Sequence, residues 1–104
     1  MNYAEKINQL YSLGAFRWTE HVLERMAKRN INREDVKLVV GNGEVIGQYP
    51  DDYPYPSCLI LGFSDTNPIH VVCGVSDDEL WMITAYYPDE GEWLDDNKTR
   101  RENV

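Results

Sequence analysis

The pattern of apolar residues changes once along this chain, at Gly41-Asn42-Gly43. Before these glycines the apolar side chains recur at helical spacing, and after them they alternate or run continuously, as in β-strands. With 104 residues the chain is long enough for one core, so we expect a single domain over residues 1–104. A helical half followed by a strand half is typical of the α+β class. We therefore predict N-terminal helices packed on one face of a three- or four-stranded antiparallel sheet.

Three helices are expected in the first half. Residues 3–13 form the first helix, and Gly14 follows it as a stop. Thr19 is a good N-cap for a second helix that ends near residue 30. Asn32 is the N-cap of a third helix, which ends at the glycine pair.

Strands are predicted over residues 44–49, 58–63, 69–75 and 79–86, with a proline-stiffened loop over residues 50–56. The last two strands are joined by a short turn and are expected to form an antiparallel hairpin. Both faces of this hairpin are largely apolar, which is more than a sheet with one solvated face needs. We expect the second face to be covered partly by the C-terminal segment around Trp93 and partly by another protein chain.

The charge is −8 overall and is unevenly distributed. Residues 17–37 carry six Lys or Arg against four acids, whereas residues 44–96 carry twelve acids and no Lys or Arg. This asymmetry permits a small anion-binding site but argues against binding along an extended nucleic-acid duplex. No membrane-spanning run or secretory signal is present, and Cys58 and Cys73 are expected to be reduced thiols, so we predict a cytoplasmic protein.

The second helix has a cationic side. At 100° per residue His21, Arg25 and Lys28 lie within about 60° of one another, and Arg29 lies at the border of the apolar face. An imidazole beside fixed positive charges is suited to a phosphodiester site, because it carries a proton near neutral pH while the cations stabilise negative charge. The same residues also fit an ordinary solvated helix with ion pairs to neighbouring glutamates.

An ordered series of short motifs resembles a known family. The motifs are His21-x3-Arg25-Met26-x2-Arg29, Ile31-x3-Asp35-Val36, Gly43-Glu44-Val45-Ile46, Tyr49-Pro50, Pro56-Ser57-x-Leu59, Leu61-Gly62, Pro68-Ile69-His70-Val71-Val72 and Ile83-Thr84-x-Tyr86-x-Pro88. This order resembles the family of domains of unknown function numbered 4258, which is grouped with the RelE/ParE-like toxins. The resemblance covers residues 15–90 and leaves a C-terminal extension over residues 91–104. It implies a toxin-like α+β fold, a small antitoxin-like protein as partner, and RNA, free or on the ribosome, as the target.

Metal-independent RNA cleavage needs proton carriers and cations. The only histidines, His21 and His70, are the candidate acid and base, and Arg25 is the candidate cation between them. We expect the two histidines to face each other across the helix–sheet layer. Tyr86 is a candidate proton donor or stacking platform, as tyrosines are in related toxins, although a tyrosine at a strand end also fits the edge of a core. Substrate-binding candidates are Arg29, Lys28 and Tyr49.

Several other site types lack their signatures. No His/Cys set has zinc spacing, the glycine pair is not a phosphate-binding loop, and no Gly-x-Ser-x-Gly motif is present. We therefore predict no metal and no cofactor. The alternative to an RNA-cleaving toxin is a non-enzymatic module of toxin-like fold that binds a protein partner, and a third hypothesis is a structural homodimer.

Overall fold

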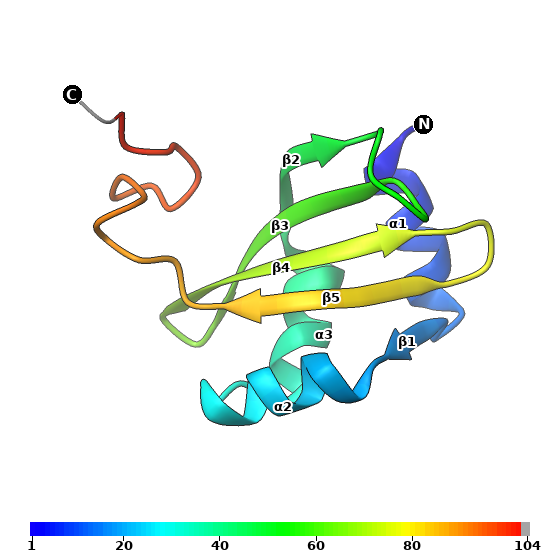
Figure 1. The fold of residues 1–104 in the computed structure, drawn as a ribbon, viewed down its shortest axis with the longest axis horizontal. Helices are drawn as coiled ribbons and strands as arrows, with labels where there is room; N and C mark the ends of the chain where they lie inside the picture. The colour runs from blue at the N-terminus through cyan, green and yellow to red at the C-terminus, as the bar shows by residue number, and fades with distance from the viewer. Residues whose placement is uncertain (103–104) are drawn as a thin grey trace.

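Five strands form one sheet. Figure 1 shows that the sheet is curved and that helices lie behind it. The computed structural model describes residues 1–102. The helices are α1 (Tyr3–Ser12), α2 (Glu20–Lys28) and α3 (Arg33–Asn42), and the strands are β1 (Phe16–Trp18), β2 (Glu44–Tyr49), β3 (Ser57–Ser64), β4 (Asn67–Val75) and β5 (Leu80–Tyr86). The predicted α+β class is confirmed.

The sheet is larger than predicted and is mixed. Its strand order is β1-β5-β4-β3-β2, with antiparallel pairing throughout except at β1, which runs parallel to β5. The predicted antiparallel strands are β2, β3, β4 and β5, and the prediction missed a fifth strand, β1, which is parallel. The missed strand, β1, has three residues between two helices, and so few residues show no readable alternation.

The helix boundaries follow the capping residues seen in the sequence. The side chain of Thr19 accepts a hydrogen bond from the Val22 amide, and that of Asn32 accepts one from the Asp35 amide. Gly14 adopts a left-handed conformation with φ of 66° and ends the turn after α1. These local signals therefore placed all three helices correctly.

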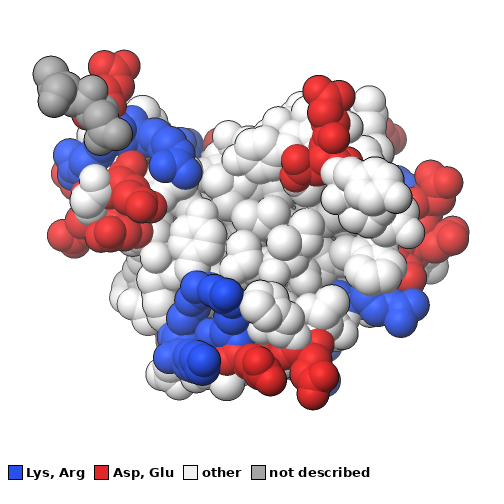
Figure 2. Space-filling model, in the orientation of Figure 1, with Lys and Arg blue, Asp and Glu red and all other residues white. Residues whose placement is uncertain are grey.

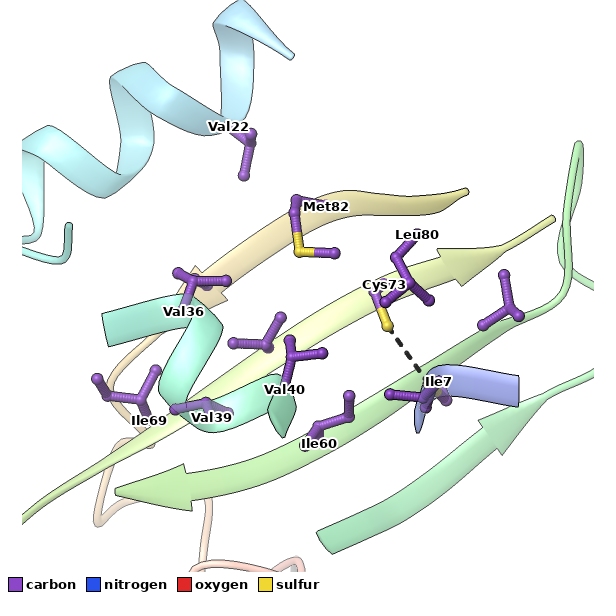
Figure 3. Packing of buried hydrophobic residues seen from close by; sticks show 14 of the residues in the cluster. Ile7, Val22, Val36, Val39, Val40, Ile60, Ile69, Cys73, Leu80 and Met82 are labelled. Atoms are coloured by element: carbon purple, nitrogen blue, oxygen red, sulfur yellow. Dashed lines mark hydrogen bonds between the residues drawn. The ribbon is translucent and has the colours of Figure 1, made fainter. Parts of the chain in front are cut away.

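The helices α1 and α3 cover one face of the sheet, and α2 packs against β5. The hydrophobic core lies between the helices and the sheet (Figure 3). In it, α3 and the sheet meet through Val36, Val39 and Val40 on the helix and Ile60 and Ile69 on the strands. Cys58 and Cys73 are free thiols in this core, paired across β3 and β4 with their sulfur atoms 3.6 Å apart.

The other face of the sheet, called here the open face, is covered only in part. The segment after β5 folds back so that Trp93 is 5% exposed and packs edge-on against His70, with ring centroids 4.6 Å apart. An ion pair between Lys98 and Glu44 ties this segment to β2. An antiparallel β-bridge between Trp93 and Arg100 joins two parts of the segment itself. The expectation that a segment around Trp93 covers part of the second face is confirmed. None of the helices described in residues 1–102 has the length and apolar character needed to cross a membrane.

Candidate functional site

The cationic side of α2 is an exposed surface. The guanidinium Nε of Arg25 donates a hydrogen bond to Nε2 of His21 at 3.1 Å, so the neutral imidazole carries its proton on Nδ1. These two residues line a shallow hollow of about 250 Å³ together with Glu24, Lys28 and Arg29. The glutamate makes the hollow less attractive to an anion than its cations alone would.

Arg29 lines this hollow and also reaches the sheet. Its Nη1 donates to the carbonyl oxygen of Ala85 at 2.9 Å and to the hydroxyl of Thr84 at 3.3 Å. β5 has no neighbouring strand beyond Met82 on this side, because β1 pairs only with its first three residues. The arginine therefore satisfies an edge carbonyl and fixes the end of α2 against the end of β5.

His70 lies in the sheet with both ring nitrogens occupied. It is fully buried, with Nε2 2.6 Å from the carbonyl oxygen of Asn97 and Nδ1 3.2 Å from the hydroxyl of Tyr86. A carbonyl only accepts, so the imidazole proton is on Nε2 and Nδ1 accepts the proton of the tyrosine hydroxyl. The oxygen lone pairs of Tyr86 are then free to face a ligand.

The electrostatics of this pair keep both groups neutral. Burial lowers the pKa of His70, the hydrogen bond to the Asn97 carbonyl opposes that shift, and the charge of Arg100 adds to it. Burial also raises the pKa of Tyr86, the charge of Arg100 opposes that shift, the charges of Tyr49 and Glu92 add to it, and that of Arg29 opposes it again. Two guanidinium groups thus act on the tyrosine hydroxyl, one from α2 and one from the C-terminal segment.

The structure divides the predicted site residues into two groups. His70, Tyr86 and Arg29 meet at the end of β5, and Tyr49 of β2 is near enough to affect the pKa of Tyr86. The remaining candidates, His21, Arg25 and Lys28, lie on the outer surface of α2.

The two histidines do not face each other, which corrects the sequence-based expectation. Ile69 and Val71 point into the core beneath the helices, so His70, between them on the same strand, points to the open face. Along β5, Met82 pairs with Trp18, just before α2 begins, and Tyr86 pairs with His70.

Sequence reasoning missed Arg100 as a site residue. Its guanidinium lies over the Trp93 ring, 4.9 Å from the centroid, at the margin of the open face. The basic end of the chain was visible in the sequence, but nothing local showed that it folds back over His70. Figure 2 shows the result, a mostly uncharged face with basic groups below it and at its upper left.

Within residues 1–102, no three His, Cys, Asp or Glu side chains come together as a group that could hold a metal ion. The chemistry available at the end of β5 is that of a hydroxyl, an imidazole and two guanidinium groups. Such a set can bind a phosphate and can transfer a proton.

Comparison with known proteins gives one match. A family model described as "Domain of unknown function (DUF4258)" matches residues 18–87. This range contains α2, all of the sheet except the first two residues of β1, and the residues His70, Tyr86 and Arg29. No curated protein and no solved structure matches the chain.

Proposed function

This chain belongs to the DUF4258 family, and we propose that it is the toxin component of a toxin–antitoxin pair, with a RelE/ParE-like fold, that cleaves RNA on the open face of its sheet. The observation that carries the proposal is the Tyr86 hydroxyl, held by His70 and lying near the guanidinium groups of Arg29 and Arg100. The order of motifs that resembles the toxin superfamily supports the same assignment.

In this mechanism Tyr86 is the general acid. The 2′-oxygen of a ribose loses its proton to water and attacks the adjacent phosphorus, and the bond from phosphorus to the 5′-oxygen breaks. The Tyr86 hydroxyl turns its proton from Nδ1 of His70 to that leaving oxygen and donates it, which gives a 2′,3′-cyclic phosphate and a 5′-hydroxyl, and water then reprotonates the tyrosinate. Burial raises the pKa of Tyr86 and makes the hydroxyl a weaker acid, and the charges of Arg100 and Arg29 oppose that shift and favour proton donation.

The guanidinium groups stabilise the charge that develops. Nη1 of Arg29 donates its hydrogen bonds to the edge of the sheet. Its Nε and Nη2 have no acceptor among the described residues, so these two groups can donate to a phosphate. Arg100 supplies a second positive charge from the C-terminal segment. His70 is fully buried and touches no ligand, so it acts as a positioning residue that fixes the tyrosine hydroxyl.

The test is cleavage of a single-stranded RNA by the purified chain in the presence of a metal chelator. Tyr86→Phe retains the ring against His70 and removes the acid, so we expect the cleavage rate to fall about 100-fold or more. Tyr53→Phe is the matched control, because Tyr53 is 94% exposed on a distant loop, and its rate should equal that of the wild type.

His21→Ala distinguishes the two placements of the site. If the catalytic centre is at the end of β5, this variant retains most of the activity and still arrests growth when expressed in bacteria. Loss of activity in His21→Ala with full activity in Tyr86→Phe would return the centre to the surface of α2 and contradict the mechanism.

A second candidate function, a non-enzymatic module that binds a protein partner, is favoured by a different observation. The net charge of −8 opposes RNA over most of the surface, and the open face retains exposed apolar side chains such as Ile83. If this second function is correct, the purified wild-type chain cleaves no RNA. Tyr86→Phe and His21→Ala then change nothing in the cleavage assay.

A further inference from the structure

A small pocket lies at the opposite end of the open face from Tyr86. It has a volume of about 110 Å³ and is lined by Tyr53, Pro54, Tyr55, Gly74, Trp81 and Ile83, with Asp52 at its margin. A cavity of about 150 Å³ holds a benzene molecule, so this pocket has room for one aliphatic side chain of about the size of leucine. The loop over residues 50–56 forms one wall, and β4 and β5 form the floor and the other wall.

Gly74 creates the depth of the pocket. A Cβ atom at this position would lie 3.5 Å from Cβ of Trp81, 3.6 Å from Cδ1 of Ile83 and 3.8 Å from Cβ of Tyr55, all ordinary contact distances. No neighbouring group therefore requires a glycine here. Its lack of a side chain leaves an apolar space between these three residues.

The walls are held in place before anything binds. The Trp81 ring contacts Tyr55, with ring centroids 5.6 Å apart, and the Arg17 guanidinium lies over it at 5.2 Å. The hydroxyl of Ser57 donates to the carboxylate of Asp52 and ties the loop to the start of β3. A preformed pocket saves an occupant the free energy of ordering it.

The surroundings of the pocket are acidic. Asp51 and Asp52 are exposed in the loop, and the turn between β4 and β5, close to Gly74, carries Asp77 and Asp78. Arg17, a cation that contacts the pocket wall, is paired through two hydrogen bonds with Glu79. In Figure 2 acidic groups stand along the right and upper edges of the face.

We propose that this pocket is a docking site for a basic segment of a partner protein, which inserts one aliphatic side chain beside Gly74 and places Lys or Arg residues against the acidic rim. Charge complementarity selects the occupant, since an RNA phosphate would be repelled by these carboxylates. The inference goes beyond RNA cleavage and does not rest on it, because the pocket shares no residue with the Tyr86 site.

The experiment is selection of a random heptapeptide display library on the full-length chain. We expect the enriched peptides to be more basic than the input library and to contain one Leu, Ile or Met. Gly74→Val fills the pocket and should weaken the binding of an enriched peptide at least tenfold. Ile83→Ser opens the wall at a side chain that is already 48% exposed, so it should weaken binding without disturbing the core.

Phe63→Ser is the matched control, since Phe63 is a strand residue with a 53% exposed apolar side chain away from the pocket. It should bind the peptide like the wild type, and thermal unfolding verifies that each variant is folded. Failure to enrich any peptide, enrichment of neutral or acidic ones, or equal binding by Gly74→Val and Ile83→Ser would overturn the proposal. So would loss of RNA binding, rather than peptide binding, in Gly74→Val, which would make the pocket a base-binding site.

Discussion

At the scale of single residues, the unusual feature is a fully buried histidine in a sheet. Charged groups are rarely buried without a partner, and His70 satisfies this rule by remaining neutral, with one nitrogen donating to Asn97 and the other accepting from Tyr86. The free energy of unfolding should therefore depend on pH through His70, in addition to the dependence that the many carboxylates cause.

Stability should fall as the pH drops below about 6.5, and His70→Gln should remove that part of the fall. Burial lowers the pKa of His70 in the folded protein, so below the ordinary pKa near 6.5 the unfolded chain binds a proton that the folded protein does not. The contribution of His70 to the free energy of unfolding is complete above pH 6.5. As the pH falls from there to the pKa of His70 in the folded protein, this contribution decreases by up to about 1.4 kcal/mol per pH unit. Urea unfolding at pH 7.5 and 5.5 measures it.

His21→Gln is the control, because it removes an exposed histidine and leaves the buried His70 in place, so the fall in stability that His70 causes should remain. Parallel loss of stability in the wild type and in His70→Gln would contradict the assignment of a buried, neutral imidazole.

The sequence could single out chemically suited side chains, but not the groups that contact them. Of the residues singled out, His70, Tyr86 and Arg29 lie at one end of the sheet, and Tyr49 of β2 affects Tyr86 only through its charge. Their partners could not be derived, because the Asn97 carbonyl and Arg100 come from a segment without periodicity. Arg29 was assigned to the border of a helical wheel, and from that position its long side chain reaches the sheet edge.

At the scale of elements, α3 lies close against β3 at Gly62. A Cβ atom on Gly62 would lie 2.8 Å from Cα of Val39, which real contacts of this kind do not permit. The glycine thus lets a helix backbone lie directly on a strand. The sequence showed where α3 and β3 begin and end, but it gave no indication of which residues touch.

Gly62→Ala should destabilise the protein by about 1–3 kcal/mol, because the backbone of α3 must move to admit the methyl group. Gly74→Ala is the matched control in the neighbouring strand, since its Cβ meets nothing closer than 3.5 Å. That variant should be neutral or slightly more stable. Urea unfolding of the two variants gives the comparison, and equal losses would show that the helix is not in close contact with Gly62.

At the scale of the whole molecule, charge lies at the edges of the open face. Figure 2 shows a mostly uncharged face with basic groups below it and at its upper left, where acidic groups stand beside them, on a chain whose net charge is −8. The sequence predicted a basic helix, an acidic middle and a basic tail. Folding brings the helix and the tail to the same margin of the sheet, because Arg29 and Arg100 both act on Tyr86.

RNA binding should therefore depend only weakly on salt. If Arg29 and Arg100 contact one phosphate each, the logarithm of the binding constant should fall with the logarithm of salt concentration at a slope of about −1.4, twice the −0.7 of a single contact. From 50 to 200 mM salt this is a loss of about sevenfold. Fluorescence anisotropy with a 2′-O-methyl oligonucleotide, which cannot be cleaved at the 2′-oxygen, measures the slope directly.

Arg100→Gln should reduce the slope to about −0.7, because one released counterion is lost with one phosphate contact. Lys6→Gln, on the outer side of α1, is the control and should leave it unchanged. A wild-type slope steeper than about −4 would require many more cations than the margin of the open face provides, and would mean that the nucleic acid follows another surface. A slope that Arg100→Gln leaves unaltered would separate the C-terminal segment from RNA binding, and Arg100 would then serve only to hold Trp93 over His70.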